Sequence, residues 1–274
     1  MALLLTASLA GIISDDDGDL YTFTSLRGEE IEIYGGQSIY QNDSVYKAVM
    51  FRAFDWVGLL VCFPLFVLGI YQYQRGRLMG QLLLGGIFTY FAYIYLIGVM
   101  GNAFNAMFLV WTGLFSTGLF GSALVLKGLD VSSLPQRLES GFPRKGLSIY
   151  TVAFGLFLPI PYLAQIIPAY TTASPPATLE IYTTLELAAL EIGIMIPLHI
   201  VGGMLLWRRK AWGYVISTLL AFAAGMTFTA LSVAQLLLYF SFQTGGPVEI
   251  IQMIVFAVIA SGFSLVTYRR VGKA

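Results

Sequence analysis

Long apolar segments alternate with short polar stretches along most of the chain. Seven of these segments are expected to be helices, at Ala53–Tyr73, Met79–Gly101, Asn105–Leu126, Leu147–Tyr170, Thr183–Trp207, Trp212–Phe240 and Pro247–Tyr268. Each is near or above the roughly 20 residues that an α-helix needs to cross the hydrocarbon core of a bilayer. The pattern therefore predicts a seven-span helical bundle over residues 53–268, with a short tail at residues 269–274.

The region before this bundle follows other patterns. Residues 1–14 are apolar but short, and no lysine or arginine precedes them, so they predict a short N-terminal helix against the bundle or a signal-like segment. Residues 15–52 are polar, and within them Leu20–Leu26 and Glu30–Tyr34 alternate in polarity around Arg27-Gly28-Glu29. Alternation on both sides of a glycine-containing turn predicts a small β-hairpin.

The composition agrees with a membrane protein. Hydrophobic residues make up 57% of the 274 residues and charged residues only 11%, whereas soluble domains carry about 25% charged residues. The predicted fold class is therefore an all-α integral membrane protein whose constant partner is the lipid bilayer. The sequence has no basic and aromatic cluster of the kind that binds nucleic acid.

Basic residues fall mainly in one set of connecting segments. Twelve of the 15 lysines and arginines lie there: Arg75, Arg77, Lys127, Arg137, Arg144, Lys145, Arg208, Arg209, Lys210, Arg269, Arg270 and Lys273. Cytoplasmic loops are enriched in these residues, so the C-terminus is predicted to be cytoplasmic in a cell membrane and residues 15–52 to lie outside. The acidic run at residues 15–19 is typical of a solvated turn, because the ligand spacing of a calcium loop is missing.

Five polar residues at or below the predicted outer membrane surface are candidates for a ligand site. They are Asp55, Asn102, Asn105, Glu186 and Glu191. We expect that they could converge on one outward-open polar pocket. Asp55 and Glu186 have a structural alternative at the level of the lipid headgroups. Glu191 differs, because it lies about 12 Å below the start of its helix and an idle carboxylate there costs about 2.5–3.5 kcal/mol.

His199, the one histidine of the chain, lies deeper on the same predicted helix. It is about 80° around the helix and about 12 Å along it from Glu191, so the two could border one cavity without touching. Pro197 removes a backbone hydrogen bond between them and predicts a kink. This pattern fits a proton- or cation-responsive element. A histidine hydrogen-bonded to a neighbouring helix is the structural alternative.

Small residues recur at helical spacing in the predicted sixth span. Ala221, Gly225 and Thr229 are each four residues apart. Small side chains at this spacing let two membrane helices approach closely. We therefore interpret these positions as helix-packing residues.

Chemistry that needs a cluster of ligands is excluded. One histidine and one cysteine cannot build a multi-histidine zinc centre or a cysteine metal cluster, and no phosphate-binding glycine loop is present, so no metal or cofactor is expected. An intramembrane enzyme acting on a lipid-like substrate stays open as an alternative, using Glu191 or a Cys62–His199 pair. The predicted depths of Cys62 and His199 match poorly, however, and a buried cysteine is usually an inert apolar residue.

Three stretches carry a resemblance in their order and spacing. They are IYQNDSVYKAVMFRAFDWVGLLVCFPL, YFAYIYLIGVMGNAFNAMFLVW and LEIGIMIPLHIVGGMLLWRRKAWGYV. Over residues 40–235 the chain resembles a family of uncharacterised bacterial multi-spanning membrane proteins. That family has an aspartate at Asp55, an asparagine at Asn105, an acid, usually aspartate, at Glu191, and a basic-Trp-Gly-Tyr turn at Arg209–Tyr214. The resemblance implies a fold and topology and adds no activity.

These observations lead to three functional hypotheses. The first is a non-enzymatic membrane protein that binds a small solute or cation in an outward-facing pocket, for transport or sensing. In it Asp55 and Glu191 supply charge, and Asn102 and Asn105 supply orienting amides. The second is the lipid-acting enzyme, and the third is an accessory subunit that docks a partner through its acidic external region.

Overall fold

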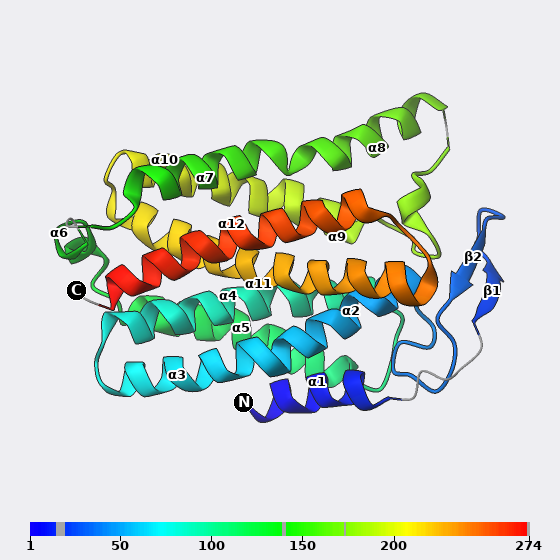
Figure 1. Ribbon diagram of the computed structural model, residues 1–274, viewed down its shortest axis with the longest axis horizontal. Coiled ribbons are helices and arrows are strands. Elements are labelled where there is room, and N and C mark those ends of the chain that lie inside the picture. Colours follow the sequence, from blue (N-terminus) through cyan, green and yellow to red (C-terminus); the bar gives the residue numbers. More distant parts are fainter. Residues whose placement is uncertain (15–19, 139–140, 173, 273–274) are drawn as a thin grey trace.

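Helices that run nearly side by side make up most of the computed structural model, with a small hairpin at one end (Figure 1). Residues 1–14, 20–138, 141–172 and 174–272 are described, so the acidic run at residues 15–19 lies outside the described residues. The elements are α1 (Ala2–Ile13), β1 (Tyr21–Thr24), β2 (Glu30–Ile33), α2 (Val45–Val57), η1 (Gly58–Cys62), α3 (Phe63–Gln74), α4 (Leu78–Gly101), α5 (Phe108–Lys127), η2 (Val131–Ser133), α6 (Leu134–Arg137), α7 (Arg144–Phe157), α8 (Pro159–Thr172), η3 (Ala177–Leu179), α9 (Glu186–Leu190), η4 (Glu191–Met195), α10 (Ile196–Trp207), α11 (Ala211–Phe242) and α12 (Pro247–Val271).

Seven helices of the described chain are long and apolar enough to cross a membrane, which confirms the prediction. They are Val45–Gln74, Leu78–Gly101, Phe108–Lys127, Arg144–Thr172, Glu186–Trp207, Ala211–Phe242 and Pro247–Val271. The short apolar helix α1 and the hairpin are confirmed as well. In the hairpin, β1 and β2 pair antiparallel with Tyr21 opposite Ile33.

The first long helix begins at Val45, eight residues before the predicted start at Ala53. Lys47 and Arg52 interrupt the apolar pattern there, which made the segment resemble a polar loop. Ser44 nevertheless caps the helix, because its side-chain oxygen accepts a hydrogen bond of 3.3 Å from the backbone nitrogen of Lys47. A local capping residue therefore sets this boundary, and hydropathy does not.

Two of the spanning helices contain a π-helical turn just before a proline. The segment η1 connects α2 to α3 ahead of Pro64, and η4 connects α9 to α10 ahead of Pro197. Proline has no backbone N–H, so the carbonyl four residues earlier loses its usual donor. The helical turn at this point contains one extra residue, so the backbone nitrogen of Ile196 donates to the carbonyl of Glu191, five residues earlier.

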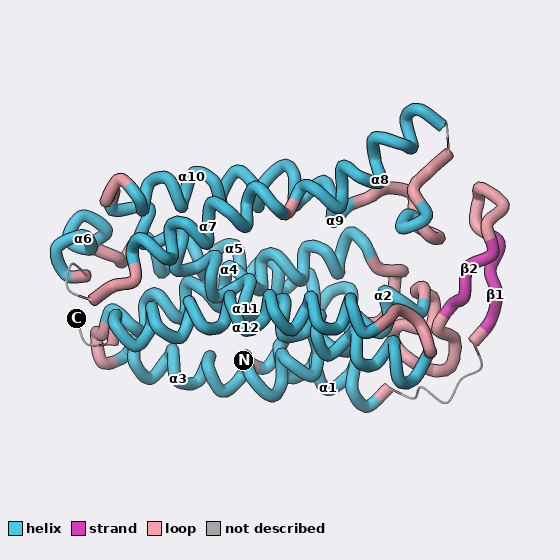
Figure 2. The backbone as a smooth tube through the Cα atoms, turned by 45° about the horizontal axis from the view of Figure 1, so that its top comes forward, coloured by secondary structure: helices cyan, strands magenta, loops and turns pink. Residues whose placement is uncertain are grey.

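The helices α4 and α11 lie at the centre of the bundle (Figure 2). In their most apolar stretches 67% and 78% of residues are buried, against 6% in α7–α8 and 11% in α12. The outer helices therefore present apolar side chains to the lipid. The small-residue spacing on α11 serves close packing at Gly225, where an added Cβ would lie 3.1 Å from the Ser261 Oγ of α12.

The short helix α1 packs against α2 and η1 through glycines. A Cβ added to Gly11 would lie 1.6 Å from the Oδ2 atom of Asp55, so the two helices approach this closely only with glycine at the contact. A Cβ added to Gly58 would lie 2.9 Å from Ser8 Oγ. This contact leaves Asp55 buried, at 5% exposure.

Candidate functional site

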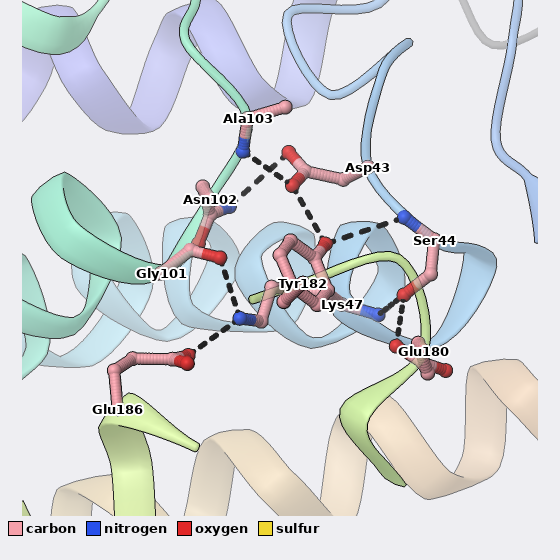
Figure 3. A network of polar contacts seen from close by, with 9 residues as sticks. All are labelled: Asp43, Ser44, Lys47, Gly101, Asn102, Ala103, Glu180, Tyr182 and Glu186. Atoms are coloured by element: carbon pink, nitrogen blue, oxygen red, sulfur yellow. Dashed lines mark hydrogen bonds and ion pairs between the residues drawn. The ribbon is translucent and has the colours of Figure 1, made fainter. Parts of the chain in front are cut away.

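A polar cluster joins several helices and loops at the end of the bundle that carries the hairpin (Figure 3). Lys47 on α2 lies at its centre. Its Nζ atom is 2.6 Å from Glu186 Oε1, donates to the carbonyl of Gly101 at 2.6 Å, and lies 3.7 Å from the ring centroid of Tyr182. The two side chains of the ion pair are only 13% and 11% exposed. Glu186 is thus one half of a largely buried ion pair.

Asp43 forms the second part of this polar cluster. It accepts hydrogen bonds from the backbone nitrogen of Ala103 at 2.7 Å, from the Tyr182 hydroxyl at 2.8 Å and from Asn102 Nδ2 at 3.3 Å. Burial raises the pKa of the Asp43 carboxyl from 3.8 to about 6, although the three hydrogen bonds oppose this rise. Asn102 therefore orients Asp43 at the turn between α4 and α5.

The segment between α8 and α9 is held to the outer loops by the same polar cluster. Arg27 in the hairpin turn donates to the backbone carbonyls of Glu180 and Tyr182, and the Ser44 hydroxyl donates to the carboxylate of Glu180. Burial raises the pKa of Glu180, while the Ser44 hydrogen bond and Lys47 oppose the rise. These contacts connect residues more than 130 positions apart in the chain and fix the outer end of the bundle.

Asn105 and Asp55 also have local structural partners. The Oδ1 atom of Asn105 accepts a hydrogen bond of 2.8 Å from the backbone nitrogen of Met107, just before α5 begins. This is a turn-forming contact typical of asparagine. Asp55 accepts a hydrogen bond of 2.6 Å from the hydroxyl of Tyr40, which lies in the loop between the hairpin and α2.

Glu191 and His199 lie away from the polar cluster, and each keeps a buried atom without a partner among the described residues, as Asn102 also does at Oδ1. Tyr93 of α4 donates to Glu191 Oε1, while Oε2 has no hydrogen-bond partner among the described residues. His199 Nδ1 lies 2.7 Å from the carbonyl oxygen of Met195, and its Nε2 likewise has no partner in the described part of the chain. The two residues are only 7% and 2% exposed.

Both residues line one cavity of about 270 Å³ inside the bundle. Its walls come from α2, α4, α7, α8, α9–α10, α11 and α12. Most of the lining is apolar or aromatic, and the polar members are Tyr46, Tyr93, Tyr162, Glu191, His199, Thr227, Gln235 and Gln252. A mostly apolar cavity with a few convergent polar groups is the usual form of a small-molecule site.

The structure does not bring the six predicted residues together. Glu191 and His199 both line the cavity. The expected convergence of Asp55, Asn102, Asn105 and Glu186 on one pocket with Glu191 does not occur, since none of the four lines this cavity and each has the partner described above. The partners of Asn102 and Glu186 lie on distant segments, so the sequence could not assign them.

Lys47, Asp43 and Tyr182 are the polar-cluster residues that sequence reasoning missed. One signal pointed to Lys47, which is one of only three basic residues on the predicted outer side. A basic residue on the same predicted side as several carboxylates is a candidate ion-pair partner. Asp43 and Tyr182 carry no comparable signal, because each lies in an ordinary polar loop.

Two further candidates for a functional site have less support. Cys62 is buried in η1 and does not line the cavity that contains His199, so the two do not form a nucleophile–base pair there. A hollow of about 530 Å³ at the other end of the bundle is lined by Arg144, Lys145 and Arg209, but basic residues at this end are what membrane orientation alone predicts. Within the described residues no group of three or more His, Cys, Asp or Glu side chains could hold a metal ion.

The seven apolar helices of the described residues define a multi-pass helical membrane protein. Glu191 and His199, which line one of its cavities, each keep a buried atom without a partner in that part of the chain. No protein-family model, curated protein or solved structure matches it.

Proposed function

We propose that the protein binds a small organic cation in the Glu191–His199 cavity, for transport or sensing across the membrane. The observation that carries this proposal is the pair of buried atoms without partners, Glu191 Oε2 and His199 Nε2, whose residues line the same cavity in the described chain. A buried polar atom left unpaired costs about 1–3 kcal/mol. A ligand group that donates a hydrogen bond to either atom would remove the cost at that atom.

The tautomer of His199 indicates what kind of ligand group is needed. Its Nδ1 atom faces a carbonyl oxygen, that of Met195, so Nδ1 carries the proton. In the neutral imidazole Nε2 is then an acceptor, as is the free oxygen of Glu191. Two acceptors in one cavity favour a ligand rich in donors, and a protonated amine is the simplest one.

The rest of the cavity suits the apolar part of such a cation. Phe51, Phe54, Phe154, Phe157, Phe228 and Phe256 contribute aromatic rings to its lining. Aromatic faces attract cations when solvent is excluded, and the hydrocarbon part of the ligand gains from burial against them. The volume of the cavity is slightly below the roughly 300–1,000 Å³ of ordinary ligand pockets, which favours a small ligand.

Binding of n-butylammonium to the detergent-purified protein, measured by isothermal titration calorimetry, tests the proposal. We expect saturable binding that Glu191→Gln weakens by about 10- to 100-fold, because a charge-assisted hydrogen bond is lost. Glu249→Gln, at an exposed carboxylate in the first turn of α12, should leave the affinity unchanged. Absence of saturable binding, or equal affinities for wild type and Glu191→Gln, would overturn the proposal.

The orientation of the chain is part of the same proposal. We infer that the hairpin is outside and that α6 is cytoplasmic, as the distribution of basic residues indicates. Single cysteines at Leu26 and Gln136, both exposed, are suitable reporters, because the native Cys62 is buried. On intact cells an impermeant thiol reagent should label the cysteine at position 26 and not the one at position 136. The opposite pattern would reverse the orientation.

A further inference from the structure

One stretch in the second half of the chain repeats the helix boundaries of a stretch in the first half, from a π-helical turn to the start of the next long helix. The π-helical turn η1 begins at Gly58 and η4 begins 133 residues later at Glu191; α3 and α10, which follow them, have the same length. The next helices, α4 and α11, begin at Leu78 and Ala211, again 133 residues apart. We call η1, α3 and α4 the first copy and η4, α10 and α11 the second copy.

Side chains that shape the backbone recur at this spacing. The identical pairs between η1 and the start of α4 are Pro64 and Pro197, Leu65 and Leu198, Gly69 and Gly202, Arg75 and Arg208, and Gly80 and Gly213. The turns between the helices match too, because Gly76 and Arg209 both have positive φ, at 67° and 57°. A Cβ added to Gly80 would lie 2.1 Å from the backbone nitrogen of Tyr73. A Cβ added to Gly213 would lie at the same distance from the backbone nitrogen of Leu206, the residue equivalent to Tyr73.

The packing of the two central helices is that of a symmetric pair. Gly85 on α4 faces Leu219 on α11. At the spacing of 133 residues, Leu219 is equivalent to Gly86, the residue that follows Gly85. Two helices that cross at equivalent positions are related by an approximate twofold axis along the bundle. Parallel repeats related in this way occur in transporters, with the ligand site where the repeats meet.

One part of the core differs strongly between the copies. In the first copy Phe66 of α3 packs against Phe88 and Phe91 of α4, with ring centroids 5.6 and 5.8 Å apart. The equivalent residues of the second copy, 133 positions later, are His199, Ala221 and Ala224. At these three positions the second copy has one imidazole and two methyl groups instead of three rings, and Phe154 of α7 packs against His199 with ring centroids 5.0 Å apart. His199 and Ala224 line the cavity.

We infer that the cavity lies where the second copy lacks the ring of Phe91, beside Ala224, and that the ligand places an aromatic ring in this space. The ligand class is then an arylalkylamine, with its ring beside Ala224 and its ammonium group at Glu191. Ala224 is a specificity-determining residue, because its methyl group leaves the room that the ring of Phe91 fills in the first copy. This inference rests on the proposed function and adds that the ligand contains an aromatic ring.

The first copy shows that the backbone does not require the polar residues of the cavity. Gly58 occupies the position of Glu191, and Phe66 occupies the position of His199, on helices of the same length and kink. The shared prolines and glycines hold the frame in both copies. Glu191, His199 and Ala224 can therefore be varied with the first copy as an internal guide to what the fold accepts.

The test compares 2-phenylethylammonium with n-butylammonium, by calorimetry on the purified full-length protein. Wild type should bind the aryl probe at least tenfold more tightly than the alkyl probe, since a phenyl ring buries more apolar surface. Ala224→Phe, which restores the residue of the first copy, should remove this preference and leave the butylammonium affinity within about threefold. Ala224→Leu serves the same purpose if the larger residue prevents folding. Phe91→Ala, in the first copy, should leave both affinities unchanged.

Each other outcome overturns a particular statement. If wild type binds neither probe, the proposed function fails. If wild type binds both probes equally, or if Ala224→Phe keeps the preference for the ring, the proposed function stands and the aromatic subsite is wrong. If Ala224→Phe loses both probes while its melting temperature stays normal, separate ring and ammonium subsites are wrong.

Discussion

Two glutamates five residues apart on one helix have opposite surroundings. Glu186 lies in the outer polar cluster, where Lys47 neutralises it at 2.6 Å. Glu191, one turn further into the membrane, has a single hydrogen bond from Tyr93 and a second oxygen without a partner in the described chain. A fold selected for stability alone would pair both carboxylates or replace them. The contrast therefore separates a structural acid from one that is available to a ligand.

The polar cluster also shows what pairing across segments achieves. Asp43, Lys47 and Glu180 each contact groups on other segments, so the hairpin turn, the start of α2, the α4–α5 turn and the segment before α9 are held together. At the cavity, Glu191 and His199 each keep a buried atom without a partner among the described residues. The cavity wall also contains Ala224 at the position where the first copy has Phe91.

The largest effect is expected from breaking the ion pair of the outer polar cluster. Lys47→Met should lower the free energy of unfolding by about 3–5 kcal/mol, because it leaves Glu186 buried without its counter-charge. The double variant Lys47→Met/Glu186→Gln should regain much of this loss. Thermal melting of the purified variants measures both. Equal melting of the single variant and wild type would show that the pair contributes little.

The next effect is a pH dependence that belongs to Asp43. Its pKa of about 6 lies above the usual 3.8, so the native state holds the proton more tightly than the unfolded chain does. The resulting stabilisation is fully present below about pH 4 and is lost as pH rises through 6, and it amounts to about 3 kcal/mol. Melting temperature should therefore fall between pH 4 and pH 7. Asp43→Asn should flatten this part of the curve, and an unchanged slope in that variant would assign the effect to other groups.

A smaller effect is expected at the cavity. Tyr93→Phe removes the one hydrogen bond to Glu191 and should cost about 1 kcal/mol of stability. Since Glu191 still lines the cavity in this variant, amine binding should persist. A loss of several kcal/mol, comparable with that of Lys47→Met, would instead place Glu191 among the structural acids.

The smallest change in stability is expected for Glu191→Gln, within about 0.5 kcal/mol of wild type. Glutamine is nearly isosteric, accepts the same hydrogen bond from Tyr93, and is cheaper to bury as a neutral group. Butylammonium binding should nevertheless fall sharply. Normal melting together with normal binding would remove Glu191 from the site.

Several features follow from the sequence alone, because they depend on local properties. Hydropathy over about 20 residues identifies the seven spans, and alternation around Gly28 identifies the hairpin. The cost of an idle carboxylate at membrane depth singles out Glu191 in the same way. Pro197 likewise indicates a local break, which the structure realises as the π-helical turn η4.

Other features were decided only by the tertiary structure. Asp55, Asn105 and Glu186 have the same residue types and predicted depths as ligand-binding residues, yet their partners are Tyr40, the backbone at Met107, and Lys47. The small residues of α11 give the same local signal whether a neighbouring helix fills the space beside them, as at Gly225, or a cavity lies there, as at Ala224. Which of the two occurs depends on side chains from other helices, and only the folded chain brings those together.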